Sequence, residues 1–514
     1  MPHVVTQPCC SDASCVYACP VNVIHPTPDE PDFLTAEQVY IDPQSCVDCG
    51  ACVDACPVDA IVPHTKLTEA NIEFAEINAE FYRRQPDRPR PILAIPPITP
   101  KADDEHTLRV AIVGSGPAAM YAADELLKQQ HVRVDMYERL DTPYGLVRFG
   151  VAPDHQSTKR VSRLFDTISR EKGFHLHLGV EVGKDITHAD LASTHHAVIY
   201  AVGASSDKRL GIPGEDLPGS IAATEFVAWY NGHPDYRDRS FDLSSERVVI
   251  VGNGNVAFDV ARIVTADPDV LDGTTIAPHA LAALRTSKVR EVVILGRRGP
   301  AQAAYTLPEL MGLVRKHSAR IVIDGSELIL DSITERDRAS GELDPGIEKK
   351  LELAAEIAAE VPAANDSRKR IVLRYLASPT EIRGDGRVEA VTVTRNKLVV
   401  SDGSVRAEAT AESEILPTGL VLRSVGYRGS RISDMPFDDR RGVIPNDHGR
   451  VLVDGEPVAG QYVVGWIKRG PSGFIGSNKS CAKETVDNLI ADFNARRLPT
   501  PHRPKRSVRS LLRI

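Results

Sequence analysis

Eight of the nine cysteines in this 514-residue chain lie between residues 9 and 56. Thiolates hold soft metals or pair as disulfides, so this group is the first candidate for chemistry. The cysteines fall into two related sets, because CVYACPVNVI (15–24) recurs as CVDACPVDAI (52–61), with seven of ten positions identical at an offset of 37 residues. A duplicated, closely spaced cysteine pattern favours metal or cluster ligation over disulfides.

The second copy has the spacing C-x2-C-x2-C-x3-C-P over residues 46–57. This pattern resembles the bacterial ferredoxin run, in which three thiolates hold one iron–sulfur cluster and the fourth, beside the proline, crosses over to a second cluster. Structural zinc is the alternative for paired cysteines, but the prolines Pro20 and Pro57 fit the crossover pattern better. Applied to both copies, the crossover predicts a [4Fe–4S] cluster bound by Cys19, Cys46, Cys49 and Cys52.

The first copy departs from the pattern. A shift of 37 residues places Asp12 opposite the ligand Cys49, and Cys10 opposite Val47. Because a carboxylate is a harder ligand than a thiolate, we expect either a [3Fe–4S] cluster or an Asp-ligated [4Fe–4S] cluster at this second site. The alternative is that Asp12 is a turn residue and Cys10 is the ligand. The other thiolates assigned to this cluster are Cys9, Cys15 and Cys56.

A glycine-rich turn follows an apolar strand in the sequence LRVAIVGSGPAAMYAADELL (108–127). Gly114 permits a tight turn, Gly116 lets the backbone approach a pyrophosphate, and Ala119 keeps the following helix close to the strand. The next strand ends at Glu138, near the distance at which an acid contacts a ribose hydroxyl. Strand, loop, helix, strand and acid in this order predict a dinucleotide-binding fold.

The same order recurs in RVVIVGNGNVAFDVARIV (247–264), which contains Gly252 and Gly254. Here the next strand ends in Arg297 and Arg298, and two guanidiniums suit the 2′-phosphate of NADP. The interval of 45 residues from Gly252 to Arg297 is longer than usual, so an excursion intervenes. An acid in the first fold and arginines in the second predict FAD first and NADPH second.

These motifs place the chain in the α/β class, with two Rossmann-like dinucleotide-binding domains preceded by a small α+β ferredoxin-like iron–sulfur domain. We expect the second fold to be inserted in the first, because AVIYAVGA (197–204) and LVLRSVGYRG (420–429) both resemble a strand ending in a glycine crossover. Helical spacing predicts a helix over 71–84, and the proline-rich segment 85–100 predicts a semi-rigid spacer. The predicted regions are a two-cluster ferredoxin domain at 1–66, a helix and linker at 67–107, the FAD domain at 108–204 and 425–495, the NADP domain at 205–424 and a basic tail at 496–514.

Six ordered motifs between residues 108 and 495 resemble those of the adrenodoxin-reductase-like ferredoxin–NADP reductases. They are GSGPAAMYAA, YGLVRFGVAPDH, IPGEDLPGSIAA, GNGNVAFDVARI, GRRGPAQAAYT and VVGWIKRGPSGFIG. With the cysteine-rich segment before them, the chain resembles the fused ferredoxin/ferredoxin–NADP reductases of actinobacteria. The resemblance implies an FAD-dependent enzyme that passes electrons from NADPH through FAD to iron–sulfur clusters, and on to an external ferredoxin or a cytochrome-type one-electron acceptor.

The resemblance also implies roles for residues at matching positions. His155 and Asp259 match family residues proposed to lie near the flavin. Hydride transfer needs no general base, so a structural hydrogen bond is the alternative to a catalytic role for either. FAD contacts are expected from Gly114, Gly116, Ala118, Glu138, Leu146, Val182, Trp466, Gly473, Phe474 and Ile475. NADP contacts are expected from Asn253, Gly254, Asn255, Val256, Arg297, Arg298 and Glu309.

Charge and composition limit the partners. Residues 1–66 carry nine acidic residues against one base, Lys66, and so hold about −8 of the formal net charge of −9. This excludes nucleic acid as a partner of the N-terminal segment and favours docking on a basic surface. Since the sequence shows no signal-like start and no apolar run of spanning length, we expect a cytoplasmic monomer without a membrane segment.

Two other functions fit parts of the sequence. The chain could be the NADPH-oxidising electron-entry subunit of a larger complex, like the small subunit of glutamate synthase. The motifs GVAPDH and GWIKRGP and the compact cysteine repeat count against this. The N-terminal domain could instead be an iron–sulfur redox sensor that regulates the reductase. The ninth cysteine, Cys481, is expected to be a buried structural thiol.

Overall fold

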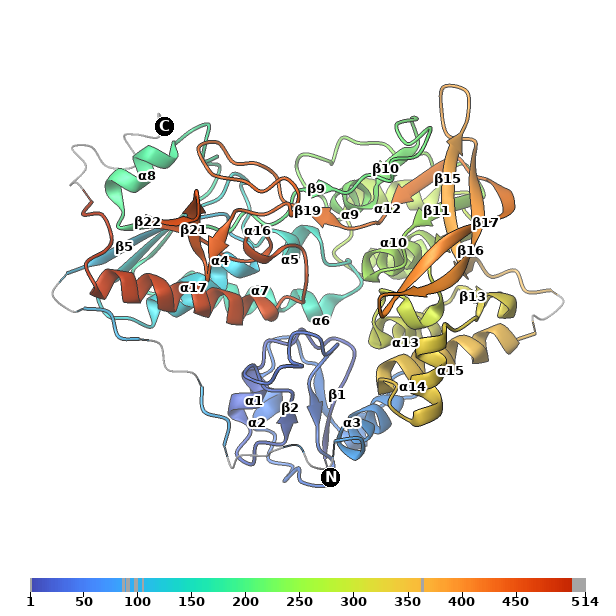
Figure 1. Cartoon of the computed structure of the whole chain (residues 1–514), viewed down its shortest axis with the longest axis horizontal. Coiled ribbons are helices and arrows are strands. Elements are labelled where there is room, and N and C mark those ends of the chain that lie inside the picture. The colour runs from blue at the N-terminus through green and yellow to red at the C-terminus, as the bar shows by residue number, and fades with distance from the viewer. Residues whose placement is uncertain are drawn as a thin grey trace.

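A computed structural model describes residues 2–85, 88, 93–96, 100–103, 106–361 and 365–501 of the chain. Figure 1 shows a small N-terminal domain, in dark blue, beneath two larger α/β domains. The predicted fold class, two Rossmann-like domains with the second inserted in the first and a small domain before them, is confirmed. Part of the proline-rich spacer, and the basic tail from residue 502 onward, lie outside the described residues.

The N-terminal domain repeats one β–α–β unit, as the duplicated sequence predicts. Strand β1 pairs antiparallel with β4, and β2 pairs antiparallel with β3, so the two copies are interleaved. The backbone repeats as well, because left-handed residues recur at the same offset of 37: Ser11 with Asp48, Ala13 with Gly50, and Asn22 with Asp59. The elements are β1 (His3–Val5), α1 (Ser14–Ala18), β2 (Ile24–His25), β3 (Tyr40–Ile41), α2 (Ala51–Ala55), β4 (Ile61–Pro63), the 3₁₀ turn His64–Lys66 and α3 (Glu73–Arg83).

The first large domain is built on a seven-stranded sheet in the order β20-β21-β22-β8-β5-β6-β7. The five strands from β22 to β7 are parallel. The three inner strands, β8, β5 and β6, are mostly apolar and buried, as expected for a sheet covered on both faces. The helices α4 and α17 pack against each other beside this sheet. The elements are β5 (Leu108–Val113), α4 (Pro117–Leu127), β6 (Val132–Tyr137), α5 (Leu146–Phe149), α6 (Gln156–Lys159), α7 (Val161–Ile168), β7 (Phe174–His177), α8 (His188–Thr194), β8 (Ala197–Tyr200), β20 (Asn446–Asp447), β21 (Arg450–Val453), β22 (Glu456–Val463), α16 (Trp466–Arg469) and α17 (Ser477–Asn494).

The second large domain has a six-stranded parallel sheet, β10-β18-β11-β12-β14-β13, and an antiparallel sheet, β15-β16-β17. The predicted excursion before β12 forms two short helices, α11 and α12. The elements are β10 (Ser220–Ala222), α9 (Ala223–Tyr230), β11 (Arg247–Val251), α10 (Asn255–Thr265), α11 (Pro268–Asp272), α12 (Pro278–Arg285), β12 (Glu291–Leu295), the 3₁₀ turn Pro300–Gln302, α13 (Leu307–Lys316), β13 (Arg320–Ile323), the 3₁₀ turn Gly325–Glu327, α14 (Ser332–Ser340), α15 (Pro345–Ala359), β14 (Arg370–Arg374), β15 (Ala377–Arg383), β16 (Ala390–Ser401), β17 (Ser404–Pro417) and β18 (Leu420–Arg423).

The chain leaves the first large domain and returns to it through two short strands, β9 (Ser206–Asp207) and β19 (Tyr427–Arg428), which pair antiparallel. The strand β9 follows the segment 197–204, and β19 lies within the segment 420–429, the two segments in which glycine crossovers were expected. The predicted domain boundaries remain predictions. Among the described residues, no helix is both long and apolar enough to cross a membrane.

The N-terminal domain contacts both large domains, and Figure 1 shows it beneath the gap between them. On one side, Cys10, Val58 and Ala60 belong to the apolar core around α4. On the other side, Val4 and Phe74 belong to the core of the second large domain. The N-terminal domain is therefore packed into the rest of the protein.

Candidate functional site

Two cysteine-lined cavities lie in the N-terminal domain. The first is named here the distal cavity. All nine cysteines of the chain are free of disulfides, so the thiols around this cavity are available as ligands. Four free thiols around one cavity fit a [4Fe–4S] cluster. The thiols are those of Cys19, Cys46, Cys49 and Cys52, the set that the crossover spacing predicts.

The second cavity is named the proximal cavity. It is lined by Cys9, Cys15 and Cys56, and by the two residues whose role the sequence left open, Cys10 and Asp12. Burial raises the pKa of the Cys9 thiol to about 11, so this side chain ionises near neutral pH only beside a positive group such as iron. Three buried or half-buried thiols around one cavity fit a second iron–sulfur cluster.

The Asp12 carboxylate has partners on both oxygens. Its Oδ1 accepts a hydrogen bond from the Ser14 amide at 3.0 Å, and its Oδ2 accepts one from the Ser14 hydroxyl at 2.7 Å. The Lys479 ammonium, on α17, lies 3.6 Å from Oδ2 and donates to the Ser14 hydroxyl at 2.9 Å. Such local contacts are typical of an aspartate in a turn, while Asp12 and Cys10 both line the proximal cavity.

The proximal cavity lies against the first large domain. The Gly476 amide donates a hydrogen bond to the Cys10 carbonyl at 2.8 Å. A Cβ on Gly476 would overlap the backbone of Ser11 and Asp12, so only glycine allows this approach. Gly476 directly follows Ile475, which packs against the same apolar core as Cys9, Cys10 and Cys56. The segment expected to contact FAD is thus continuous with the segment that contacts the proximal cavity.

The first glycine loop provides an open cradle. Gly114 has a left-handed φ of 97°, and a Cβ there would lie 2.7 Å from the Ala201 carbonyl oxygen. A Cβ on Gly116 would meet no atom within 4 Å, so its backbone faces open space where a pyrophosphate fits. Glu138 is buried and accepts hydrogen bonds from the Ser115 amide at 3.1 Å and hydroxyl at 2.6 Å. The carboxylate thus lies at the edge of this loop.

Other residues expected to contact FAD surround the same loop. Gly465 brings the start of α16 against α4, since a Cβ on Gly465 would lie 2.6 Å from Ala118 Cβ. Trp466 follows it, and its indole N–H donates to the Ser472 carbonyl at 3.1 Å. Leu146 begins α5 and is 41% exposed, and its neighbour Gly145 approaches Gly116. Val182 lies after β7, and Gly473, Phe474 and Ile475 precede α17.

The second glycine loop is tied to the helix that carries Glu309. The Asn255 side chain accepts a hydrogen bond from the Thr306 amide at 2.9 Å, and its amide group donates to the Thr306 hydroxyl at 3.3 Å. Thr306 precedes α13, so Asn255 fixes the start of that helix. A Cβ on Gly254 would meet no atom within 4 Å, which leaves open space beside the loop. Asn253 lies against Gly296, and Val256 is in the first turn of α10.

Arg297 and Arg298 follow β12, at the carboxyl end of this strand of the second sheet. Within the described chain, neither guanidinium has a carboxylate within ion-pair distance. Partial burial, together with the neighbouring Arg297, lowers the pKa of Arg298. Two adjacent, unpaired guanidiniums fit a dianionic phosphate, because each would gain charge-assisted hydrogen bonds from it.

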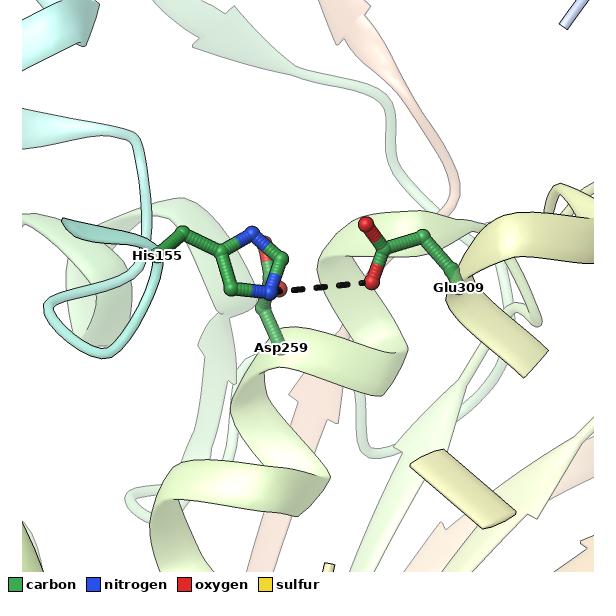
Figure 2. Close-up of side chains that lie close together, drawn as sticks. All are labelled: His155, Asp259 and Glu309. Atoms are coloured by element: carbon green, nitrogen blue, oxygen red, sulfur yellow. Dashed lines mark ion pairs between the residues drawn. The ribbon is translucent and has the colours of Figure 1, made fainter. Parts of the chain in front are cut away.

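The three residues His155, Asp259 and Glu309 come together between the two large domains (Figure 2). His155 comes from the loop before α6, and its Nε2 lies 3.8 Å from Glu309 Oε2 and 4.0 Å from Asp259 Oδ1. Arg262 joins them, since it donates to Asp259 at 2.6 Å and lies 3.6 Å from Glu309 Oε2. It also forms a two-bond ion pair with Asp154.

Burial and charge oppose each other in this cluster. Burial raises the pKa of Glu309, against the opposing effect of His155. Burial would also raise the pKa of Asp154, but the Arg262 guanidinium outweighs it and the pKa is lowered. Three ligand-type atoms lie within 4.8 Å of one another, but Arg262 already supplies a buried cation to these carboxylates. The cluster is an ion-pair network across the domain boundary.

Comparison with known proteins identifies both parts of the chain. A family model described as "4Fe-4S dicluster domain" matches residues 9–60, and one described as "Pyridine nucleotide-disulphide oxidoreductase" matches residues 108–277. A Mycobacterium tuberculosis (strain H37Rv) protein named "Probable ferredoxin/ferredoxin--NADP reductase" is 53% identical over 98% of this chain and 85% of its own length. The chain belongs to the ferredoxin/ferredoxin–NADP reductase family.

Two further relatives match the nucleotide-binding part of this ferredoxin/ferredoxin–NADP reductase. The Bos taurus mitochondrial NADPH:adrenodoxin oxidoreductase is 40% identical over 78% of this chain and 82% of its own length. The solved structure of Mycobacterium tuberculosis FprA in complex with NADPH has a TM-score of 0.73 at 47% identity, covering 79% of this chain and 90% of that chain. The predicted resemblance to adrenodoxin-reductase-like enzymes is confirmed.

Sequence reasoning missed three residues of this reductase and misjudged one. Arg262 stands three positions after Asp259, which is the helical spacing of an ion pair, so the sequence contained a signal for Arg262. Asp154 directly precedes the candidate His155, and this proximity was the signal for Asp154. Lys479 gave no signal, because its partner Asp12 is remote in sequence. Cys481 is only partly buried, and its sulfur accepts a hydrogen bond from the Gly465 amide at 3.3 Å.

Proposed function

We propose that this chain, an FAD-dependent ferredoxin–NADP reductase, carries electrons from NADPH to a one-electron acceptor through iron–sulfur clusters in its own N-terminal domain. FAD supplies the conversion between hydride transfer and single-electron transfer. The observation that carries the proposal is the contact between Gly476 and Cys10, which joins the segment expected to contact FAD to the proximal cavity. This contact makes the N-terminal domain a docked electron acceptor.

The two glycine loops and their neighbours would hold the nucleotides. The open backbone at Gly116 and the Glu138 carboxylate support FAD on the first sheet. The unpaired Arg297 and Arg298 support NADP on the second. The remaining FAD residues are Gly114, Ala118, Leu146, Val182, Trp466, Gly473, Phe474 and Ile475. The remaining NADP residues are Asn253, Gly254, Asn255, Val256 and Glu309.

His155 and Asp259 act in this proposal as positioning residues. His155 belongs to the first large domain, and Asp259 and Glu309 belong to the second, so their ion-pair network fixes how the two nucleotide sites face each other. No proton is transferred by these residues, because hydride transfer requires none.

We also propose a [4Fe–4S] cluster in the distal cavity and a [3Fe–4S] cluster in the proximal one. The distal cavity offers four thiols, whereas Cys9, Cys15 and Cys56 are the thiols facing the proximal cavity that the crossover assigns to it. Ser14 and Lys479 hold the Asp12 carboxylate, which supports three-iron occupancy over Asp ligation. The "4Fe-4S dicluster domain" match supports two clusters in this segment.

Anaerobic titration with NADPH tests the function. We expect the flavin absorbance to bleach first and the cluster absorbance to fall next, at a rate independent of protein concentration because the acceptor is in the same chain. Clusters that never accept electrons would instead indicate a redox sensor. Co-purification with a large synthase-type subunit would indicate the electron-entry subunit of a complex.

Iron analysis with low-temperature electron paramagnetic resonance tests the cluster types. We expect about seven irons per chain and a [3Fe–4S] signal in the oxidised protein. Asp12→Cys should raise the count to about eight and remove that signal, because it restores the fourth thiolate. Cys10→Ala is the matched control and should leave the iron count and the [3Fe–4S] signal unchanged. About eight irons in the wild type would contradict the three-iron assignment.

We propose that one copy of the chain is the functional unit and that it works in the cytoplasm. A single chain supplies both nucleotide loops and both cavities, so the electron path needs no second copy. Nine free cysteines are typical of a reducing compartment. Light scattering coupled to size-exclusion chromatography tests the monomer, and a dimer at micromolar concentration would contradict it.

A further inference from the structure

The two cavities differ in what covers them. Cys10 and Asp12, which line the proximal cavity, contact Gly476 and Lys479, so the first large domain lies against this cavity. Cys49, which lines the distal cavity, is the one exposed cysteine among the nine in the chain. A redox group in the distal cavity is thus the one that an external protein can approach.

One buried core contains residues from the linings of both cavities. Cys15, at the proximal cavity, and Cys19 and Cys52, at the distal cavity, belong to one buried core inside the N-terminal domain. An electron that enters at the proximal cavity therefore reaches the distal cavity without leaving the protein. The order along the path is the FAD segment, the proximal cavity, the distal cavity and then the solvent-exposed surface at Cys49.

The surface around Cys49 combines apolar and acidic side chains. Val47 and Val21, which line the distal cavity, are 58% and 37% exposed. Asp48 is half-exposed and pairs with His3, and Asp54 is exposed on α2. The exit face is defined by these residues: Val21, Val47, Asp48, Cys49 and Asp54.

Acids of the N-terminal domain occur both at its contacts with the large domains and on the exit face. Asp12, Glu37 and Asp59 form ion pairs with bases of the two large domains, so they serve the internal docking. Asp48 and Asp54 remain on the exit face, and Lys66 is the one lysine or arginine in residues 1–66. The exit face is therefore an acidic surface with an apolar centre.

We propose that external acceptors take their electrons at the exit face, and that the acceptor is a basic one-electron redox protein of the cytochrome type. Apolar contact would form at Val47 and Val21, with lysines of the partner around Asp48 and Asp54. A free acidic ferredoxin would be repelled by the same charges. This inference rests on the proposed function and chooses between the two acceptor classes that it leaves open.

The overall step balances with the NADPH that the activity supplies. One NADPH loses two electrons and becomes NADP⁺ with release of one proton, and two ferric haem proteins each gain one electron. No other oxidant or reductant is needed. The chain itself returns to its starting oxidation state after each pair of transfers.

Charge substitutions on the exit face test the proposal, with mitochondrial cytochrome c as the basic probe. Asp54→Lys and Val47→Lys should each raise the Kd for cytochrome c on the oxidised holoprotein by about three- to tenfold at low salt, and lower kcat/KM for its reduction similarly. The matched control is Asp385→Lys, because Asp385 is an exposed acid in the turn between β15 and β16. This variant should change neither the Kd for cytochrome c nor kcat/KM by more than about twofold. A plant-type ferredoxin, which is acidic, should instead bind the two exit-face variants more tightly than it binds the wild type.

The rate of flavin bleaching by NADPH should be the same in all variants. Unchanged cytochrome c binding in both exit-face variants would overturn the proposal. An equal loss of affinity for cytochrome c in Asp385→Lys would overturn it as well. Binding is measured without NADPH, so it decides the docking surface even if the wild-type flavin fails to bleach. That last result would overturn the proposed function alone.

Discussion

The backbones of Gly476 and Asp12 lie in direct contact across the boundary between the N-terminal domain and the first large domain. Beside this contact, the Lys479 ammonium lies 3.6 Å from the Asp12 carboxylate. A side chain at position 476 would occupy the space of the Asp12 backbone. The close approach between this segment and the residues of the proximal cavity therefore requires glycine at position 476. Four predictions follow from this and related contacts.

Replacing Gly476 should separate hydride transfer from electron transfer. In Gly476→Ala the new Cβ overlaps Ser11 and Asp12, so the N-terminal domain must shift away. We expect flavin bleaching by NADPH to keep its rate and the following cluster reduction to slow by about tenfold or more, measured by anaerobic stopped flow. Gly273→Ala is the control, because a Cβ there meets only one atom, at 3.7 Å. Equal rates in the two variants would contradict the docked arrangement.

Removing the unpaired guanidiniums should weaken NADPH selectively. The double variant Arg297→Ala/Arg298→Ala loses the charge-assisted bonds to a 2′-phosphate, so KM for NADPH should rise by about 10- to 100-fold. KM for NADH should stay within about twofold, because NADH lacks that phosphate. Steady-state reduction of ferricyanide with each nucleotide measures both, and Arg406→Ala serves as an exposed control. A parallel loss with NADH would show that the arginines hold some other group.

Removing Arg262 should destabilise the chain. Its guanidinium is buried beside three carboxylates, so Arg262→Met leaves them without their cation. Breaking such a buried network costs about 3–5 kcal/mol of unfolding free energy, measured by urea denaturation. Arg285→Met breaks an exposed pair with Asp272 and should give no measurable change. A loss in Arg262→Met as small as in this control would refute the buried network.

Lys159 should add a pH dependence to stability. Its ammonium donates to the Asn231 side chain at 3.0 Å, and burial lowers its pKa from 10.5 to about 8. Between pH 8 and 10.5 the unfolded chain therefore binds more protons than the folded chain, so the contribution of Lys159 to stability rises with pH.

We expect wild type and Lys159→Met to differ in how their unfolding midpoints change from pH 7 to pH 10. The wild type should gain stability relative to the variant over this range. The exposed Lys172→Met is the control and should follow the wild type. A constant difference between wild type and Lys159→Met would mean that Lys159 keeps its ordinary pKa.

The sequence predicts what depends on local spacing. The offset of 37 residues and the crossover rule assign seven cysteines to two clusters, and the structure places these two sets around two cavities, with Cys10 as an additional residue at the proximal one. The two glycine loops were also predictable, because a strand, a turn and a helix in succession leave few conformations for Gly114 and Gly252. In both cases the information lies within one short segment.

Contacts between remote segments could not be predicted in this way. Asp12 has the position of a cluster ligand in the repeat, but Ser14 and Lys479 occupy its oxygens. The docking of residues 2–83 against both large domains likewise depends on pairs such as Glu73 with Arg315. A single sequence gives no signal for such pairs, because surface acids and bases have many equivalent partners.

One of these remote contacts has a wider consequence. Glu37, in the N-terminal domain, accepts a hydrogen bond from the Leu307 amide at 2.6 Å and pairs with Lys350 at the same distance. Leu307 begins α13, the helix that carries Glu309. In the proposed NADP site Glu309 contacts the nucleotide, so nucleotide binding and docking of the N-terminal domain would act on one shared helix. We therefore expect the two to be coupled: by reciprocity, if the bound nucleotide favours the docked domain by some factor, the docked domain favours nucleotide binding by the same factor.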